Sequence, residues 1–367
     1  MLITLDHLRR YAVARSLFKP TTLKGAFQRI GFVQADPIRA PARAQDLILR
    51  HRAKDYHAGD LERLYSKLEI EEDFFVVYGF MTKSIQALMH PRLDAGVPAE
   101  GPREWPAARK KRAQLVLRFV RERGEAHPRE VDDYFSHGTV RNYWGGLSSA
   151  TTHLLAAMHY RGMLRVLRRE KGIRIYAVHE HGPATADAAE RSARIDALVD
   201  AAVQIYAPLS GKCLADLVRR LRFAVPQWQG DLKGAFQRAK QRLAHVSVDG
   251  VEWYWPSQEN AAHSTVPDTV RLLTPFDPVV WDRDRFEMFW GWQYRFEAYV
   301  PAPKRRLGYY ALPLLWRDRV IGWGNLHVND GKLDSEFGYV AHHPRDRAFK
   351  RELNAELERI KAFLAIG

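Results

Sequence analysis

The chain has 367 residues, which is enough for roughly two to four domains of ordinary size. An apolar content of 46% excludes an intrinsically disordered protein, because such a chain can bury a sizeable core. Lysines and arginines number 57 against 43 aspartates and glutamates, and the resulting formal charge of +14 favours a polyanionic partner, which we expect to be nucleic acid.

Cysteine usage and the absence of common motifs narrow the class of protein further. The single cysteine, Cys213, excludes an internal disulfide, and the sequence lacks the paired Cys/His spacing of a zinc site. The apolar runs of the sequence are too short for us to expect a signal peptide or a membrane span. It also lacks a phosphate-binding loop and a dinucleotide-binding glycine fingerprint. We therefore expect a cytoplasmic, nucleoid-associated protein that uses no metal, nucleotide or other cofactor.

Residues 1–95 predict a first winged-helix domain. A less certain wing is expected among residues 55–80, and the Gly- and Pro-rich stretch 96–106 is typical of a linker. The predicted elements are, in chain order, helices at 5–16 and 22–30, a strand at 32–36 and a helix at 42–51.

Residues 104–182 give the clearest module, with three helices followed by a hairpin, which is the order of a winged helix. Arginine forks match phosphate oxygens, so a basic wing predicts contact with DNA, although a solvated charged hairpin would have the same sequence. The predicted helices are 114–123, 128–135 and 148–162, and the hairpin strands are 163–167 and 173–178. The basic side chains of this wing are Arg165, Arg168, Arg169, Lys171 and Arg174.

The remaining sequence predicts a third winged helix, a β-rich segment and a final helix. Residues 190–262 repeat the winged-helix order, with an Asp-Gly turn at 249–250. Short, evenly spaced β-rich runs within 268–345 predict a barrel or sandwich, and a charged helix lies within 346–367. In the third module we expect helices at 195–206, 213–223 and 230–243 and strands at 246–248 and 252–255; in the β-rich segment we expect strands at 308–315, 319–324, 325–328 and 335–340.

Two polar side chains of the first module, Gln34 and Asp36, are candidates for chemistry. On a strand, residues i and i+2 face the same side, so the amide and the carboxylate would point at one target. The alternative is a helix opening, with Asp36 as the N-cap and Pro37 at the first helical position. Pro41 would disturb the first turn of such a helix, and the choice stays open at this point.

An amide beside a carboxylate suits cleavage of a nucleoside C–N bond, which builds positive charge on the sugar. The carboxylate can stabilise that charge and activate water, while the amide holds the water. An alkylated base already carries positive charge, so it leaves without a strong acid. The basic residues Arg39, Arg43 and Arg50 follow the pair, and Lys304 and Arg305 precede a predicted strand; all five are candidates for gripping phosphates, with an ordinary basic surface as the alternative.

Three sequence blocks carry a resemblance to a known family. They are Gln34-Ala35-Asp36 with the following Arg43–Arg50, Leu272–Arg283, and Tyr294–Arg305 running into Gly308–Pro313. With these blocks the chain resembles, over nearly its whole length, the winged-helix DNA glycosylases that unhook interstrand crosslinks, the YcaQ/AlkZ type. One departure is that Val77–Ser84 lacks the histidine of the family's His-Ala-Ser-like segment, which leaves the lesion preference open.

The resemblance implies an α+β protein with tandem winged helices followed by a C-terminal β-barrel, arranged around double-stranded DNA. It implies a monofunctional DNA glycosylase, a hydrolase of N-glycosyl bonds that acts in base excision repair of alkylation damage. Its substrates would be N7-alkylated purines, including those in interstrand crosslinks. It assigns catalysis to Gln34 and Asp36, and in our interpretation Asp36 activates water and Gln34 positions it. We expect a monomer.

Two further points bear on this interpretation. A crosslinked base is tethered to the opposite strand, so an open basic cleft suits it better than a tight pocket, and no aromatic base-sandwich motif is obvious in the sequence. The alternative function is a non-catalytic winged-helix regulator or repair accessory protein, because winged helices most often only bind DNA.

Overall fold

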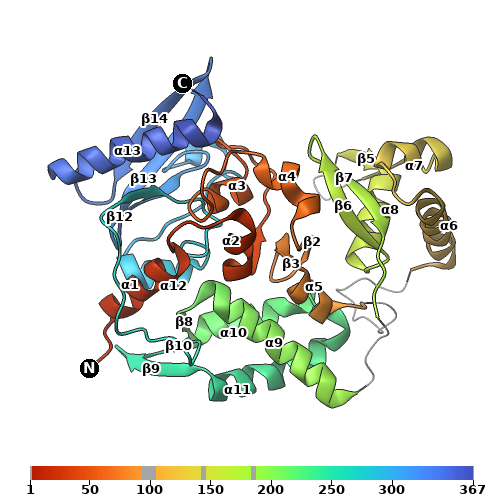
Figure 1. Ribbon diagram of the computed structural model, residues 1–367, viewed down its shortest axis with the longest axis horizontal. Helices are drawn as coiled ribbons and strands as arrows, with labels where there is room; N and C mark the ends of the chain where they lie inside the picture. Colours follow the sequence, from red (N-terminus) through yellow and green to blue (C-terminus); the bar gives the residue numbers. More distant parts are fainter. Residues whose placement is uncertain (1, 93–104, 142–145, 183–186, 367) are drawn as a thin grey trace. The chain divides into compact units, whose positions relative to one another are not determined.

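The computed structural model describes residues 2–92, 105–141, 146–182 and 187–366 (Figure 1). The chain forms two compact units, each assembled from separated stretches of sequence. Unit 1 comprises Met1–Asp60, Asp200–Leu217 and Phe236–Gly367, and unit 2 comprises Leu61–Val199 and Val218–Ala235. The five consecutive domains expected from the sequence have other boundaries and stay a prediction. Most of the expected linker, residues 96–104, lies outside the described residues, whereas Trp105 packs into the core of unit 2.

The N-terminal part of unit 1 begins with two capped helices. The Thr4 hydroxyl accepts from the backbone N of His7, and the Thr22 hydroxyl accepts from the backbone N of Gly25. Gly31, at φ 75°, ends the second helix. The elements are α1 (Leu5–Ser16), α2 (Leu23–Ile30), β1 (Phe32–Gln34) and α3 (Ala44–Leu49). The predicted strand and third helix of this segment are therefore shorter than expected.

Two antiparallel sheets form the rest of unit 1. The smaller has the order β8-β10-β9, with the predicted Asp249-Gly250 turn in the left-handed region between β9 and β10. The larger has the order β11-β12-β13-β14, and α13 lies along it (Figure 1). Their strands are β8 (Leu209–Ser210), β9 (Ala244–Val248), β10 (Val251–Trp255), β11 (Val270–Leu272), β12 (Leu312–Trp316), β13 (Arg319–Asn329) and β14 (Lys332–Tyr339); the helices are α12 (Arg283–Trp290), the 3-10 turn η4 (Ala302–Lys304) and α13 (Arg347–Leu364).

The larger sheet differs from the sequence prediction in two ways. The strands expected at 319–324 and 325–328 are one continuous strand, β13. Among the described strands, β11 and β14 end the order without pairing with each other, so the sheet is open and the closed barrel stays a prediction. The secondary structure of the described residues is nevertheless a mixture of helices and antiparallel sheets, as the α+β prediction required.

Unit 2 contains the helix-helix-helix-hairpin order predicted for residues 104–182. Its core joins Val116 and Val120 to Leu155 and Met158, and the hairpin β6–β7 packs beside α8 (Figure 1). Pro128 starts α7 inside a capping box formed by His127 and Glu130. The elements are α4 (Asp60–Leu64, whose first residue belongs to unit 1), η1 (Tyr65–Lys67), β2 (Ile70–Phe74), β3 (Tyr78–Thr82), α5 (Lys83–Met89), α6 (Ala107–Arg123), α7 (Pro128–Phe135), β4 (Thr139–Arg141), β5 (Leu147–Ser149), α8 (Ala150–Tyr160), β6 (Leu164–Glu170), β7 (Ile173–Val178), η2 (Leu221–Phe223) and η3 (Pro226–Asp231).

Three helices, α9 (Ala188–Tyr206), α10 (Gly211–Arg220) and α11 (Leu232–Arg242), contribute residues to both units. They correspond to the helices predicted for the third module. Among the described helices of the chain, none combines the length and the apolar character needed to cross a lipid bilayer.

A fully buried ion pair joins the N-terminal helices of unit 1 to the loop that follows β11. Arg52 binds Asp277 through two hydrogen bonds of 2.8 and 3.0 Å, and neither side chain is exposed to solvent. The same guanidinium donates to the carbonyl oxygens of Ser16 in α1 and Ile48 in α3, at 3.0 and 2.7 Å. Asp277 in turn accepts from the backbone N of Val279 at 3.0 Å. With its charges and donors satisfied in this way, the pair fixes the loop against both helices.

Replacing one partner should destabilise unit 1 strongly. Arg52→Met leaves the Asp277 carboxylate buried without its cation, and we expect the free energy of unfolding to fall by about 3–5 kcal/mol. Urea unfolding followed by tryptophan fluorescence measures this change. The double variant Arg52→Met/Asp277→Leu removes both charges and should recover much of the loss. A double variant less stable than Arg52→Met would contradict this account of the pair.

Candidate active site at the end of strand β1

The side chain of Gln34, the last residue of β1, is oriented by Trp281. The indole Nε1 of Trp281 donates to Gln34 Oε1 at 2.9 Å. An indole N–H can only donate, so the facing atom must be the amide oxygen, and the Nε2 group is directed elsewhere. The Trp281 ring also lies 4.6 Å from the ring of Tyr206, measured between centroids. Trp281 thus sets which end of the amide can donate to a bound molecule.

Asp36 opens a turn, not a helix. Its Oδ1 accepts from the backbone N of Ile38 at 2.9 Å, and its own backbone N donates to Gln45 Oε1 at 3.4 Å. In the described backbone, residues 37–43 form no helix, and α3 begins only at Ala44. The N-cap alternative for Asp36 is therefore wrong. The strand-face argument also fails, because β1 ends at Gln34 and leaves Asp36 in irregular backbone.

The environment of Asp36 keeps its carboxylate basic. Burial raises the pKa of this half-buried carboxyl, and the hydrogen bond from Ile38 offsets only part of that effect. Two tyrosines lie within electrostatic reach of it. Burial raises the pKa of Tyr299 and of Tyr310, and the negative charge of Asp36 raises both further. A carboxylate balanced by one peptide N–H, without a cation, is suited to accept a proton.

The basic residues that follow the pair have different environments. Arg39 is exposed and lies in irregular backbone, and Arg43 is half-buried at the N-cap position of α3. Arg50 is buried, donating to Glu356 at 2.6 Å and to the carbonyl of Leu272 at 2.9 Å. The expectation that Arg50 grips phosphate is not supported by this geometry, because its guanidinium holds α13 and β11 together.

The two basic residues near η4 lie beside exposed aromatic rings. Arg305 Nε donates to the carbonyl of Val300 at 2.8 Å, and its guanidinium lies 5.0 Å from the ring centroid of Tyr309. Lys304 is exposed. Burial raises the pKa of Tyr299, and electrostatic interactions with Asp36 and Tyr309 raise it further, so Arg305 lies beside one of the residues that act on Tyr299.

The wing arginines of unit 2 already have carboxylate partners. Arg165 pairs with Glu71, Arg168 with Glu125 and Glu170, and Arg169 and Arg174 with Glu72. Glu72 is fully buried, which alone would raise its pKa, but hydrogen bonds and charges from Arg169 and Arg174 lower the pKa to about 2. Lys171, at the exposed tip of the hairpin, has φ 50°. Four of the five basic side chains of the wing are thus paired with carboxylates, and contact of the wing with phosphate stays a prediction.

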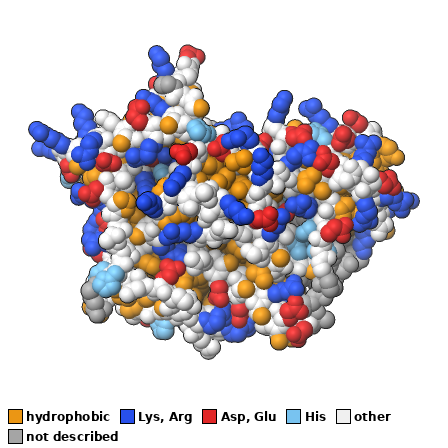
Figure 2. All heavy atoms as spheres, in the orientation of Figure 1, with side chains coloured by type: hydrophobic (Ala, Val, Ile, Leu, Met, Phe, Trp, Pro, Cys, Tyr) orange, Lys and Arg blue, Asp and Glu red, His pale blue; other side chains and the backbone are white. Residues whose placement is uncertain are grey.

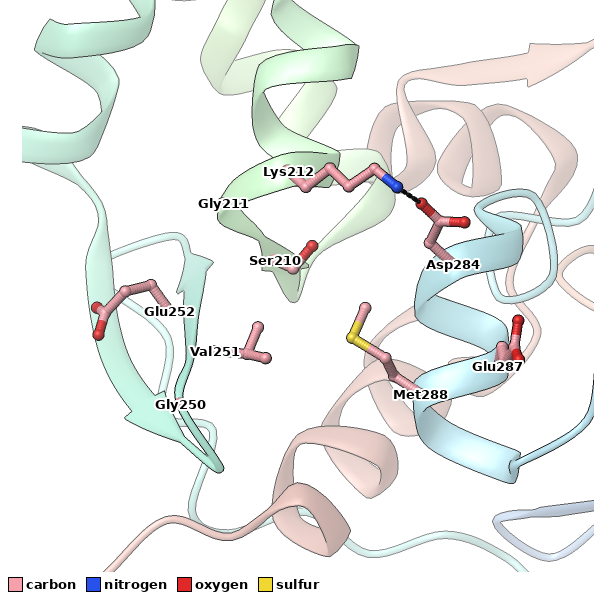
Figure 3. A pocket seen from close by; sticks show the side chains of 9 residues that line it. All are labelled: Ser210, Gly211, Lys212, Gly250, Val251, Glu252, Asp284, Glu287 and Met288. Carbon is pink, nitrogen blue, oxygen red and sulfur yellow. Dashed lines mark hydrogen bonds and ion pairs between the residues drawn. The ribbon is translucent and has the colours of Figure 1, made fainter.

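Charge on the visible surface is mixed, since Figure 2 shows acidic side chains among the spread of lysines and arginines. An open pocket of about 630 Å³ in unit 1 contains none of the predicted site residues. In Figure 3 Lys212 reaches toward Asp284, Val251 and Met288 lie between β10 and α12, and the carboxylates of Glu252 and Glu287 point away from these two apolar side chains.

Comparison with known proteins now identifies the family. A protein-family model described as "DNA glycosylase AlkZ-like" matches residues 27–363, and the chain belongs to the AlkZ-like DNA glycosylase family. Its fold is similar to that of the DNA glycosylase AlkZ from Streptomyces sahachiroi, with a TM-score of 0.66 and 14% sequence identity over 100% of this chain and 98% of that chain. The resemblance inferred from the sequence blocks is confirmed, and with it the predictions of a DNA glycosylase enzyme and of a role in DNA repair.

Sequence reasoning found Gln34 and Asp36 but missed Trp281, Tyr299 and Tyr310. Trp281 and Tyr299 lie inside the blocks 272–283 and 294–305 that carry the resemblance, and Tyr310 lies in the stretch that follows. A tryptophan in such a block gives no sign of which distant side chain its N–H will meet. Only the folded chain brings these residues to β1.

The ion pairs beneath the wing should give unit 2 a characteristic acid sensitivity. The folded pKa of Glu72 lies below its ordinary value of 4.5, so its stabilising contribution is complete above that value and is lost as pH falls toward 2. We expect Glu72→Gln to lower the free energy of unfolding by about 3–5 kcal/mol at pH 7, and we expect a smaller difference from wild type at pH 3.5. Urea unfolding at both pH values measures this.

Glu170→Gln is the matched control, because Glu170 is an exposed partner of Arg168 in the same hairpin. An exposed pair contributes about 0–1 kcal/mol, so this variant should unfold nearly as wild type does. If Glu72→Gln lowers the free energy of unfolding by the same amount at pH 7 and at pH 3.5, the titration assigned to Glu72 is contradicted.

Proposed function

We propose that this protein is a monofunctional DNA glycosylase that hydrolyses the N-glycosidic bond of N7-alkylated purines, including purines in DNA interstrand crosslinks. The observation that carries the proposal is the oriented pair at the end of β1, in which Trp281 sets the direction of the Gln34 amide and Asp36 is a basic carboxylate without a cationic partner among its hydrogen bonds. Membership of the AlkZ-like family supports DNA as the substrate.

In the proposed step a water oxygen bonds to C1′ of the damaged nucleotide while the bond from C1′ to N9 of the purine breaks. The electron pair of that bond neutralises the positive charge of the N7-alkylated ring, so the base leaves as a neutral molecule. Asp36 removes one proton from the water, and the product is an abasic sugar with a hydroxyl at C1′. The developing positive charge on the sugar is stabilised by the Asp36 carboxylate before the proton moves.

Each side chain of the pair has a distinct role. Ile38 occupies one lone pair of Asp36 Oδ1, and the other lone pairs of the carboxylate can accept a water hydrogen. The Nε2 group of Gln34 donates to the water oxygen, since Oε1 is bound to Trp281. Burial keeps the Asp36 pKa raised, which makes the carboxylate a stronger base than an exposed aspartate.

Contact with the DNA backbone is assigned to five basic residues that are exposed or half-buried. The scaffold in this proposal is the series of winged-helix modules with the C-terminal β-rich segment, acting as a monomer on double-stranded DNA. Family membership favours this enzyme over the non-catalytic regulator that the sequence also allowed. The proposed phosphate contacts are Arg39, Arg43, Lys171, Lys304 and Arg305.

Replacing the catalytic carboxylate should separate activity from binding. We expect Asp36→Asn to lower the rate of base release at least about 100-fold while DNA affinity changes little, because a general base is lost and no phosphate contact is. The melting temperature should stay equal or rise, since a raised folded pKa means that ionisation of Asp36 at neutral pH destabilises the fold. The assay scores abasic product from duplexes carrying N7-methylguanine or a nitrogen-mustard crosslink.

Asp249→Asn is the control for this substitution, because Asp249 lies in an exposed two-residue turn that accepts asparagine equally well. Base release by Asp36→Asn at the rate of the control would remove the catalytic assignment. Absence of abasic product from both duplexes with the wild-type protein would contradict the proposed reaction and favour a DNA-binding role.

Removing the indole N–H should affect the same step to a smaller degree. Trp281→Phe keeps an aromatic ring but frees Gln34 Oε1, and we expect the single-turnover rate of base release to fall about tenfold, the scale of one lost hydrogen bond, with DNA affinity unchanged. Trp290→Phe is the matched control, since Trp290 Nε1 donates to the carbonyl of Asp318 at the same distance of 2.9 Å in unit 1. Equal rates in the two variants would show that Gln34 acts without the indole.

A further inference from the structure

Four aromatic rings of unit 1 form a connected cluster, which we call the aromatic cluster: Phe276, Phe296, Tyr299 and Tyr310. The Phe296 ring lies at its centre, 5.2 Å from Phe276, 5.3 Å from Tyr310 and 6.0 Å from Tyr299 between centroids. All three contacts are edge-to-face, with interplanar angles of 69°, 87° and 82°. Edge-to-face packing holds each ring at a defined angle to its neighbour.

The aromatic cluster runs from the interior to the surface. Tyr310 is buried, and its hydroxyl bonds to the hydroxyl of Thr274 at 3.0 Å. Tyr299, at the other end, is 67% exposed although its ring contacts Phe296 edge-to-face. A large ring that is anchored from beneath and still mostly open to solvent leaves contact area for a ligand.

The exposed end of the aromatic cluster belongs to the surroundings of Asp36. The loop that anchors Tyr310 through Thr274 is the one that carries Trp281 to Gln34. The carboxylate of Asp36 acts electrostatically on both Tyr299 and Tyr310, adding to the effect of burial in raising the pKa of each phenol. A raised phenol pKa keeps both hydroxyls protonated and both rings neutral at physiological pH.

We propose that Tyr299, supported by Phe296, is the binding platform for the positively charged alkylated purine whose glycosidic bond is attacked at Asp36. This inference rests on the proposed function and names the part of the site that recognises the base. The face of a tyrosine ring is electron-rich, so it attracts a flat cation more strongly than it attracts a neutral base. An unmodified guanine lacks that charge and would stack less favourably.

A platform on one side of the base also fits a crosslinked substrate. A base held between two rings must leave the helix almost completely, which a tether to the opposite strand prevents. A single exposed ring can contact a base that is only partly displaced. The neighbouring Tyr309, 41% exposed and covered by the Arg305 guanidinium at 5.0 Å, places a cation where a phosphate next to the displaced nucleotide could be bound.

The test compares Tyr299→Leu, which keeps apolar bulk but removes the π face, with Tyr299→Phe, which keeps the ring. The matched control is Tyr134→Leu, because Tyr134 in unit 2 is also 67% exposed and its ring also packs on phenylalanines, 4.9 Å from Phe119 and 4.8 Å from Phe135. The first measurement is affinity for duplexes with 2′-fluoro-N7-methyl-2′-deoxyguanosine or unmodified guanosine at one position. The fluorine suppresses base release, so binding is measured without turnover.

We expect wild type, Tyr299→Phe and Tyr134→Leu to prefer the cationic base to the same extent, within about twofold. In Tyr299→Leu the ratio of the affinities for the cationic and the unmodified base should fall about fivefold or more. This variant should also release N7-methylguanine about tenfold more slowly, as expected for one lost stacking contact. An unchanged preference in Tyr299→Leu overturns the platform while leaving the proposed reaction intact. A loss in Tyr299→Phe as large as in Tyr299→Leu also overturns it, because the hydroxyl would then be responsible.

The two proposals fail in different ways. If wild-type protein releases no base from the unfluorinated duplex, the proposed function fails. The affinity comparison on the fluorinated duplex needs no catalysis, so it still decides whether Tyr299 recognises a cationic base.

Discussion

Arg52 and Asp277 meet in the interior of unit 1, where each charge is stabilised by the other and by nearby backbone groups, and Arg52 also donates to the Ser16 hydroxyl. Two charges removed from water are tolerated only with excellent geometry, so the loop after β11 is restricted to the conformation in which Asp277 reaches Arg52. That conformation carries Thr274 to Tyr310 on one side and Trp281 to Gln34 on the other. The orientation of the Gln34 amide and the position of the aromatic cluster both depend on the conformation that this pair fixes.

Burial acts on three carboxylates of this protein with different outcomes. Asp277 is compensated by Arg52 and Glu72 by two arginines, and both serve the structure. Asp36 is compensated by one peptide N–H, so its burial raises the pKa and leaves proton affinity available for a reaction. The identity of the partner, more than the degree of burial, separates the chemical carboxylate from the structural ones.

Local sequence signals predicted local structure well. The bounds of α1 and α7, the end of α2 and the Asp-Gly turn between β9 and β10 all lie where the sequence indicated. Gln34 and Asp36 were recognisable as an unusual pair, but the strand argument used to orient them was wrong. The tryptophan that orients Gln34, and the glutamates Glu71 and Glu72 that pair with wing arginines, lie far away in sequence. Such contacts are set by tertiary packing, which neither periodicity nor spacing records.

Gln34 and the indole that holds it are separated by 247 positions along the chain. During synthesis, β1 leaves the ribosome long before the loop with Asp277 and Trp281 exists. A nascent or truncated chain that ends before this loop carries both Gln34 and Asp36, yet it lacks the indole that orients the amide and the carboxylate that pairs with Arg52. Base excision removes a base from DNA and with it the coding information at that position. A site that combines residues from both ends of the chain can form only when synthesis of the chain is nearly finished.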